Sequence, residues 1–360
     1  MTPSAHIGLP KYVRDRDIVH DRDGRVFVAL GHIQPSDRIL SFLKYIPDPE
    51  GEWRSGDNRY RRVFWGGVDS VTKGMAMVPP DYVVDDAHFG TSLLEPPRES
   101  ISKYFSPELR LSEIFREGPS DELESAAKHL AEVLHDALGI PLERIGVTGS
   151  ICWKAHDPAR SDINMNIYGY REAWRLQYGY EELTEQNRHV TLRSYSDWGP
   201  ALSRMMERFP QVPSGVVENL FLGRSELCID GKCIGIMPVL RPNEVPIRHG
   251  SEHYASMTDD PVNITMDIHD VRYGIFMPAV YEGISEPVDA IRGARVSRMM
   301  VYDGVFRGLL RTGDRVETVG TLQRVRSGPE ADDGNEFYQI MVGTKNGYGR
   351  EFIHVVKASA

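Results

Sequence analysis

The clearest periodic pattern of the chain is helical and lies between residues 120 and 138. Apolar residues recur there at the spacing of one helix face, at Leu123, Ala127, Leu130, Leu134 and Leu138. Ser120 is placed to cap the start of this helix, and Gly139 to end it. Weaker patterns predict two further helices, over 171–178 and over 198–209, the second stopped by Pro210.

Both ends of the chain show strand patterns instead. In the first hundred residues, apolar segments at 25–30 and 39–46 are set off by turn residues, and no long helical period occurs. After residue 252 the best strands follow at 262–268, 274–281, 296–302, 315–325 and 336–343. We expect an α+β protein with a β-rich N-terminal region (1–100), a middle domain (101–250) and a C-terminal β-barrel domain (251–360).

The most informative segment lies in the middle domain. A short apolar strand over 145–148 is followed directly by Gly149 and Ser150. After eleven intervening residues a second strand begins at Asp162. A glycine at such a bend lets a ligand approach the backbone, where amide groups can bind a phosphate. In the second strand Asp162, Asn164 and Asn166 alternate with apolar residues, so they share one face. The sequence therefore predicts a phosphate seat beside an oxygen-rich strand.

This layout resembles the nucleotidyltransferase superfamily typified by DNA polymerase beta. The family motif is an apolar residue, Gly-Gly or Gly-Ser, a spacer, and two carboxylates one residue apart; Gly149, Ser150 and Asp162 match it. The resemblance implies a central mixed sheet with helices over about 105–245. It also implies that Gly149 and Ser150 hold a triphosphate, and that Asp162 and position 164 bind catalytic Mg²⁺ for two-metal phosphoryl transfer.

Two departures from the family motif weaken the expected metal site. Asn164 stands where the second carboxylate should be, and Gly235 occupies the site-facing position of the strand that should carry the third. Magnesium prefers charged oxygen ligands, so we expect weak Mg²⁺ binding at Asp162 unless Asp230, Asp267 or Asp270 reaches the site. An alternative interpretation is an unrelated α+β domain in which the polar strand face is simply solvated.

The C-terminal region carries a local basic patch. Residues 289–326 contain eight arginines and four acids. The sequence of residues 313–322 resembles the strand and turn sequences of small barrels of the oligonucleotide-binding type. Such barrels combine cations with stacking aromatic residues. The candidate nucleic-acid-binding residues are Arg298, Tyr302, Phe306, Arg307 and Arg324. Alternatively, the barrel packs on its neighbour and the arginines pair with acids. The run 59–65, Arg-Tyr-Arg-Arg-Val-Phe-Trp, leaves the same two interpretations open.

Composition limits the possible functions further. The chain has 360 residues, 41% of them hydrophobic, and a formal charge of −10, so unselective binding of polyanions by the whole surface is excluded. No apolar run approaches the roughly 20 residues of a spanning helix, and we expect a cytoplasmic protein without a membrane partner. Of the three cysteines, Cys228 and Cys233 flank an Asp-Gly turn and should lie opposite each other in a hairpin, as two thiols in contact.

Three functional hypotheses follow. The first is a nucleotidyltransferase-fold protein that binds a nucleoside triphosphate or a nucleic-acid end, such as that of RNA, with a degraded two-metal site and little transfer activity. The second is an active metal-dependent nucleotidyltransferase acting on RNA, DNA or protein. The third is a nucleic-acid-binding module acting mainly through the C-terminal barrel. A looser likeness of residues 12–49 and 273–281 to uncharacterised archaeal polymerase-beta-like proteins implies no function.

Overall fold

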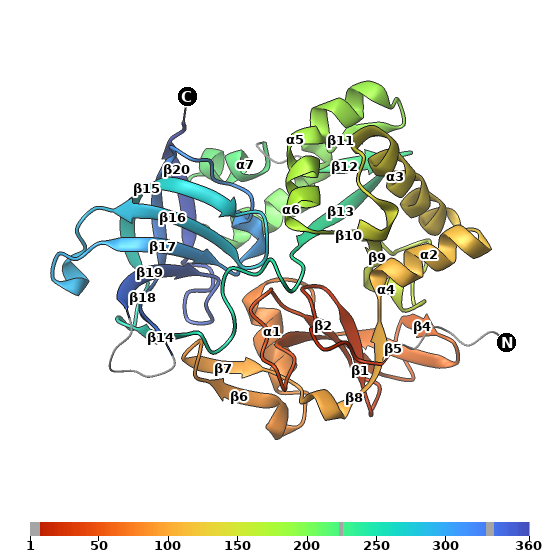
Figure 1. The fold of residues 1–360 in the computed structure, drawn as a ribbon, viewed down its shortest axis with the longest axis horizontal. Coiled ribbons are helices and arrows are strands. Elements are labelled where there is room, and N and C mark those ends of the chain that lie inside the picture. Colours follow the sequence, from red (N-terminus) through yellow and green to blue (C-terminus); the bar gives the residue numbers. More distant parts are fainter. Residues whose placement is uncertain (1–7, 223–225, 329–334, 360) are drawn as a thin grey trace.

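The computed structural model describes residues 8–222, 226–328 and 335–359, and its strands form three large sheets. Each sheet comes from one stretch of the chain, and the three lie around the centre of the molecule (Figure 1). In that view the N-terminal sheet is red to orange, the helices of the middle part are yellow to green, and the C-terminal strands are cyan to blue. The fold is therefore mixed α+β, as expected.

The N-terminal sheet has six strands in the order β4-β5-β3-β2-β1-β8. Its strands are β1 (Ile18–Asp21), β2 (Val26–Ala29), β3 (Ser41–Pro47), β4 (Trp53–Ser55), β5 (Asn58–Arg62) and β8 (Ile101–Phe105). A separate hairpin pairs β6 (Val83–Asp86) with β7 (Thr91–Leu94). Each face of the six-stranded sheet contributes to its own hydrophobic cluster. The strands expected at 25–30 and 39–46 correspond to β2 and β3.

This region also contains a helix that the sequence did not predict, α1 (Gly67–Met75). It follows Gly66, and both Gly66 and Gly67 adopt positive φ angles, of 120° and 72°. Only Gly74 of the helix is buried, where it approaches Leu43 of β3. Val71 and Met75 pack against the clusters of the N-terminal sheet, but a helix of nine residues is too short to show a clear period in the sequence.

The middle sheet has the order β11-β12-β13-β10-β9, with β10 antiparallel to β9 and parallel to β13. Its strands are β9 (Ile145–Thr148), β10 (Ile163–Tyr168), β11 (Val190–Leu192), β12 (Leu227–Ile229) and β13 (Lys232–Val239). The helices of this part are α2 (Pro107–Glu117), α3 (Glu122–Leu138), α4 (Gly149–Cys152) and α5 (Tyr170–Gln186). The apolar face of α3 packs on β9 and β10 in one core.

Helix α3 begins one residue later than the sequence suggested. Asp121, not Ser120, is its N-cap, and its carboxylate accepts hydrogen bonds from the backbone N–H groups of Leu123 and Glu124 at 2.9 and 3.0 Å. Ser120 lies just outside, where its own N–H donates to the Glu124 carboxylate. Gly139 ends the helix with φ 60°, as expected.

The hairpin between β12 and β13 confirms the expected register, because Cys228 lies directly opposite Cys233. The sequence favoured two thiols in contact over a redox or metal role and left their oxidation state open; in the structure the two sulfur atoms form a disulfide. The register could be predicted because the Asp-Gly turn fixes it, whereas the same pattern does not report the oxidation state of the pair.

The C-terminal strands form a seven-stranded sheet that curls into a half-barrel. They are β14 (Glu252–Ser256), β15 (Val262–Tyr273), β16 (Ala279–Ser285), β17 (Val296–Val301), β18 (Arg315–Ser327), β19 (Glu336–Val342) and β20 (Phe352–Lys357). The first half of the long β18 pairs with β15 and its second half with β19, which bends the sheet back on itself. The strand expected at 274–281 is largely wrong, because β16 begins only at Ala279.

Two helices from the middle of the chain cover this half-barrel. Both α6 (Tyr195–Arg208) and α7 (Ser214–Leu222) contribute side chains to the C-terminal core. A capping box at Ser194 and Asp197 starts α6. Short helical turns occur at Pro80–Tyr82, Arg98–Ser100, Leu142–Arg144, Asp289–Ile291 and Gly304–Phe306. Within the part of the chain that the structure describes, no helix has the length and apolar character needed to cross a membrane.

Candidate functional site

The glycine-serine bend and the polar strand meet, as the sequence predicted. Asn164 of β10 lies between Thr148 of β9 and Gly235 of β13 in the sheet register. A Cβ atom at Gly149 would lie 3.3 Å from Asn164 Nδ2, and one at Gly235 would lie 2.9 Å from Asn164 Oδ1. Any side chain at Gly235 would therefore displace Asn164. The three residues that correspond to the phosphate seat and the second and third carboxylate positions pack against one another.

Ser150 follows this bend in the four-residue helix α4 and is buried. Its hydroxyl lies 3.3 Å from that of Ser161, which also accepts the backbone N–H of Asp157 at 2.9 Å. These bonds tie the loop before β10 to the bend. His156 belongs to the same loop, but its Nε2 contacts the Asp121 carboxylate at 2.7 Å and so points to the start of α3.

The polar face of β10 changes character along its length. Asp162 is exposed, Asn164 is half-buried, and Asn166 is completely buried, where its amide donates to the Tyr168 hydroxyl at 2.9 Å. The guanidinium of Arg14 lies 4.1 Å from the centre of the Tyr168 ring, so the N-terminal segment covers this end of the strand. The interpretation of a solvated strand face is therefore wrong beyond Asn164.

The same segment is held by a buried charge network. Arg14 pairs with Asp17 and with Glu108 of α2, and the Tyr104 hydroxyl donates to Asp17 at 3.1 Å. Burial raises the pKa of Asp17 to about 6, against the opposing effect of Arg14. The network fixes residues 14–17 across the edge of the middle sheet. It thereby fixes Arg16, whose carbonyl accepts a hydrogen bond from the Thr148 hydroxyl at 3.2 Å, directly before the bend.

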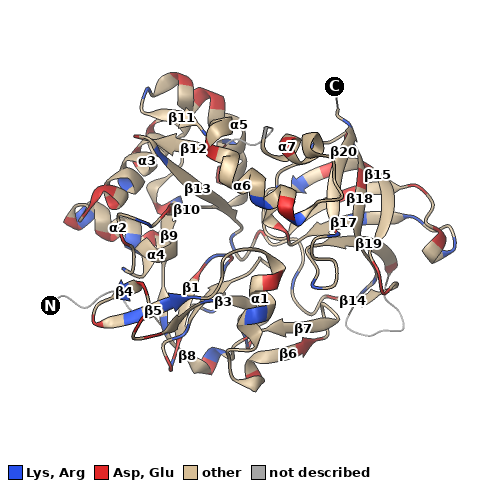
Figure 2. Ribbon diagram, turned by 180° about the vertical axis from the view of Figure 1, so that it is seen from behind, with Lys and Arg blue, Asp and Glu red and all other residues tan. Residues whose placement is uncertain are grey.

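Three cations of the N-terminal part, which we call the basic row, lie beside this bend: Arg16, Lys44 of β3 and Arg62 of β5. All three are half-buried. The pKa of Lys44 is lowered to about 8, mainly by burial and then by the neighbouring charges of Arg62 and Arg16. Asp162 acts in the opposite direction. Among the described residues, no carboxylate forms an ion pair with Lys44 or Arg62, and Figure 2 shows basic positions along β5. An anion bound here would relieve this repulsion.

Arg62 also connects the basic row to an exposed aromatic residue. Its guanidinium lies 4.5 Å from the centre of the Trp65 ring, and Trp65 is 66% exposed. Arg62 Nε donates to the Phe64 carbonyl at 2.8 Å, which holds the side chain in place. One face of a large ring is thus open to solvent next to a cluster of cations, an arrangement that suits stacking of a base.

The residues present do not fit a Mg²⁺ site. Asn164 and Gly235 replace two of the three expected carboxylates, and the alternative acids are engaged elsewhere. Asp230 contacts His129 and His189, Asp267 pairs with Arg315, and Asp270 pairs with Arg272. In the described part of the chain, the only cluster of potential metal ligands is Asp197 with Cys228 and Cys233, whose sulfur atoms are joined to each other. Asp162 instead lines an open hollow of about 330 Å³ with Arg160 and Lys232.

The candidate residues of the half-barrel are less accessible than the sequence suggested. Phe306 is fully buried in the barrel core, with its ring 5.1 Å from that of Phe352. Arg298 is 7% exposed and donates to Glu252 at 3.0 and 2.7 Å. Neither side chain is exposed enough to contact nucleic acid in this structure. Both residues are buried by packing, because strand β17, which carries Arg298, and the turn Gly304–Phe306 are covered on each side.

The other three barrel candidates have different surroundings. The Tyr302 ring lies 5.8 Å from Phe89, a residue of the N-terminal part, and burial raises the Tyr302 pKa well above its usual value. Arg324 is half-buried, 3.8 Å from Glu336. Arg307 alone reaches toward the middle sheet, where it lies 2.8 Å from the Met237 sulfur. Arg298 and Arg315 pair with acids, as the alternative interpretation of the basic patch expected.

Sequence reasoning missed Arg16 and Lys44. Lys44 stands in the strand pattern between Leu43 and Tyr45, where a single lysine reads as the exposed face of a sheet. Arg16 belongs to an alternating charged run, Arg14-Asp15-Arg16-Asp17, which is a usable signal of closely spaced ion pairs. Neither pattern reveals that the two residues face a bend more than a hundred residues away.

Comparison with known proteins gives one similar sequence. The chain is 21% identical over 359 residues to the uncharacterised protein MJ1086 of Methanocaldococcus jannaschii, a match that spans 95% of this chain and 99% of the archaeal protein. No protein-family model and no solved structure matches the chain. The similarity extends along all three sheets, but it carries no functional information.

Proposed function

We propose that this protein binds a nucleoside triphosphate or a phosphorylated nucleic-acid end on a nucleotidyltransferase-like sheet, and that it has little or no transfer activity. The phosphates would lie against the Gly149 bend and the basic row of Arg16, Lys44 and Arg62. The base would stack on the exposed face of Trp65. The proposal concerns binding, because the residues at the bend do not supply the ligands of a two-metal mechanism.

The sheet supports the family resemblance. A strand ending in Gly-Ser runs antiparallel to the strand that carries Asp162 and Asn164, and that strand is parallel to β13. The family motif needs these three strands to be neighbours, so that bend and carboxylate positions can contact one ligand. Contact between Gly149, Asn164 and Gly235 meets this requirement.

The observation that carries the proposal is the imbalance of charge beside the bend. The charges of Arg62 and Arg16 both lower the pKa of Lys44, and Asp162 acts in the opposite direction. Arg16 lies 3.5 Å from the buried Asp15, whereas Lys44 and Arg62 form no ion pair with a described residue. Holding three cations together costs free energy unless a mobile anion offsets the repulsion. Triphosphates and terminal phosphates carry several negative charges and have many acceptor oxygens, which cations of this kind bind well.

The half-barrel offers weaker support for nucleic-acid binding. Its strands β15 to β19 follow the order 1-2-3-5-4, with the third and fifth strands parallel, which resembles barrels of the oligonucleotide-binding type. However, the outer face of its strands packs against the N-terminal part through Met300 and Phe89. We therefore assign binding to the basic row and not to the barrel.

Calorimetric titration with ATP, in EDTA and again in Mg²⁺, tests the proposal. We expect ATP to bind in EDTA, with an affinity that Mg²⁺ does not increase. Lys44→Met should lower this affinity about tenfold, because it removes one charge-assisted contact. The matched control is Lys73→Met, which removes an exposed lysine of α1 paired with Asp69. A 5′-phosphorylated and a 5′-hydroxyl oligonucleotide distinguish a nucleic-acid end from a free nucleotide.

Two outcomes would contradict the proposal. One is an affinity that rises about tenfold on addition of Mg²⁺, with the gain abolished in Asp162→Ala, which would indicate a working metal site. The other is label transfer from a radioactive triphosphate that exceeds that of Asp162→Ala, which would identify an active transferase.

A further inference from the structure

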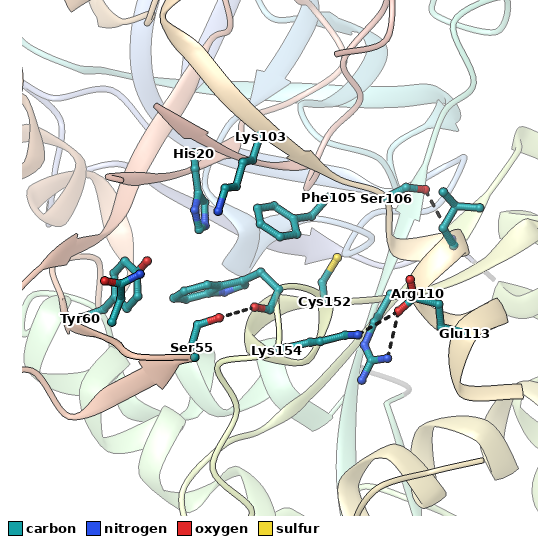
Figure 3. Close-up of a pocket in the computed structure, with 14 residues that line it drawn as sticks. His20, Ser55, Tyr60, Lys103, Phe105, Ser106, Arg110, Glu113, Cys152 and Lys154 are labelled. Atoms are coloured by element: carbon teal, nitrogen blue, oxygen red, sulfur yellow. Dashed lines mark hydrogen bonds and ion pairs between the residues drawn. The ribbon is translucent and has the colours of Figure 1, made fainter. Parts of the chain in front are cut away.

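A separate cavity of about 220 Å³ lies between the N-terminal sheet and the helices α2 and α4, and its lining includes no residue of the basic row (Figure 3). We call it the Trp153 pocket. Its aromatic lining comes from four elements: His20 of β1, Tyr60 of β5, Phe105 of β8 and Trp153 after α4. His20, Tyr60 and Trp153 are at most 5% exposed, so the walls are rigidly packed.

The rings of the Trp153 pocket meet edge to face. The Trp153 ring lies 4.9 Å from that of Tyr60 and 5.2 Å from that of His20, at interplanar angles of 87° and 76°. The His20 and Phe105 rings are 4.6 Å apart. Such an arrangement presents both edges and faces of aromatic rings to the cavity, which suits a flat aromatic ligand.

The backbone behind Trp153 is fixed by two hydrogen bonds from other elements. The Ser55 hydroxyl donates to the Trp153 carbonyl at 3.0 Å, and Arg110 Nε donates to the Ile151 carbonyl at 3.2 Å. The indole Nε1–H of Trp153 is itself buried and has no hydrogen-bond partner in the structure. The Nε1 atom has almost no accessible surface, so it is the ring of Trp153 and not its N–H that borders the cavity.

The charges around the Trp153 pocket are not balanced. Arg110 and Lys154 both contact Glu113, at 3.2 and 3.3 Å, and Arg110 also pairs with Glu124. Lys103 forms no ion pair with any described residue. Lys103 lies opposite His20 in the β1–β8 register, and Figure 3 shows its ammonium group beside the rings of His20 and Phe105.

We propose that the Trp153 pocket is a second binding site, which takes a small planar aromatic ligand with a negatively charged group. The ring lies among Trp153, Tyr60 and Phe105, and the anionic group contacts Lys103. Known ligand sites mostly fall between about 300 and 1,000 Å³, so a cavity of this size takes a ligand of one or two rings.

The Trp153 pocket is a binding site and not a centre of thiol chemistry. Cys152 lines the cavity, but burial raises the pKa of its thiol well above the usual value. A thiol in this environment stays protonated and is a poor nucleophile. No covalent step is therefore part of the proposal.

Three nearly isosteric probes test the role of charge: benzoate, benzamide and benzamidinium. Binding to the full-length protein is measured by ligand-observed NMR titration. We expect saturable binding of benzoate with about tenfold higher affinity than benzamide, and still weaker binding of benzamidinium, because one charge-assisted hydrogen bond distinguishes them. No saturable binding of benzoate, or equal affinities for all three probes, would overturn the proposal.

Two variants locate the site. Lys103→Met, at an exposed side chain, should reduce the affinity for benzoate to that for benzamide and leave benzamide unaffected. Trp153→Phe shortens one aromatic wall of the cavity and should weaken both probes. Since Trp153 is a core residue, this variant can fail to fold, and Lys103→Met then still tests the proposal. Unchanged affinity for benzoate in Lys103→Met would overturn the proposal.

The test is independent of the proposed function. Lys44→Met, which should impair ATP binding, should leave benzoate binding unchanged, and Lys103→Met should leave ATP binding unchanged. Loss of benzoate binding in Lys44→Met would show that the anion binds at the basic row, and would overturn the assignment of a second site.

Discussion

The outer face of the half-barrel and the basic row beside Gly149 both carry cations next to aromatic rings, yet they differ in how those cations are paired. On the barrel, Arg298 forms two hydrogen bonds to Glu252 and a third to Gln339 at 2.8 Å. In the basic row, Lys44 and Arg62 have no carboxylate partner among the described residues. The number of arginines therefore does not separate the two regions, whereas the pairing of their cations does.

The two regions also differ in what covers them. The outer side of β16, β17 and β19 packs against the N-terminal part, where Val280, Met300 and Met341 contact the cluster that includes Phe89 and Ile33. This face is an interface between two parts of the same chain. The basic row is left half-buried at the meeting point of β3, β5 and the Gly149 bend. Burial of one cationic face and exposure of the other explains why only the second is a candidate for binding.

The largest expected effect is on stability and follows from the buried barrel pair. Arg298→Met leaves Glu252 buried without its partner and should lower the free energy of unfolding by about 3–5 kcal/mol. Urea denaturation measures this change. As a control, Arg326→Met removes a half-exposed pair with Glu336 and should cost less than about 1 kcal/mol. Equal losses in the two variants would show that the barrel pair is no more important than a surface pair.

The next effect depends on pH and concerns Glu95, which directly follows strand β7 of the β6–β7 hairpin. Burial, together with the charge of Asp86, raises the pKa of Glu95 to about 8. The folded protein keeps this proton while the unfolded chain loses it near pH 4.5, so wild-type stability should fall as the pH rises from about 4.5 to 8. Glu95→Gln removes this fall, and its relative gain should reach about 4 kcal/mol at pH 8.

Urea denaturation of both proteins at pH 5, 6.5 and 8 measures the difference, with the exposed Glu50→Gln as the control. Stability curves of Glu95→Gln and wild type that run parallel across this pH range would contradict the assignment of a protonated Glu95 at the interface.

Much of the local structure could be predicted from the sequence, for identifiable reasons. The bend at Gly149, the strand that begins at Ile163 and the register of Cys228 with Cys233 all follow from patterns within about twenty residues. Helix α2 was missed, because its start depends on Ser106 as N-cap with Pro107 at its first position, and its buried face includes the charged residue Arg110. A buried arginine breaks the apolar period that identifies a helix.

The surroundings of the candidate sites could not be predicted in the same way. Whether Arg298 is exposed depends on Glu252, 46 residues away, and on the N-terminal hairpin. Trp153 reads in the sequence as part of a loop, yet it packs in the N-terminal core 93 positions from Tyr60. Alternation tells which residues share a face of a strand, but contacts between distant segments decide what covers that face.

A third prediction separates the basic row from an ordinary surface. Since the pKa of Lys44 is lowered to about 8, affinity for ATP should fall about tenfold between roughly pH 7 and 9, as Lys44 loses its charge. Lys44→Arg retains the positive charge throughout this range and should show a flat profile. Calorimetric titrations at several pH values measure both. Identical profiles would mean that Lys44 does not contact the phosphates.

The smallest effect is also the one that most directly distinguishes binding from catalysis. Asp162 is the negative charge that acts on Lys44, so Asp162→Asn removes a repulsion toward bound phosphate and should raise ATP affinity by about two- to threefold. Asp136→Asn makes the same change at an exposed position of α3 and serves as the control. In a metal-dependent site the sign reverses, because Asp162 would then hold the ion that bridges to the phosphates. Weaker ATP binding by Asp162→Asn in the presence of Mg²⁺ would therefore restore the interpretation as a working transferase, whatever the charge of residue 164.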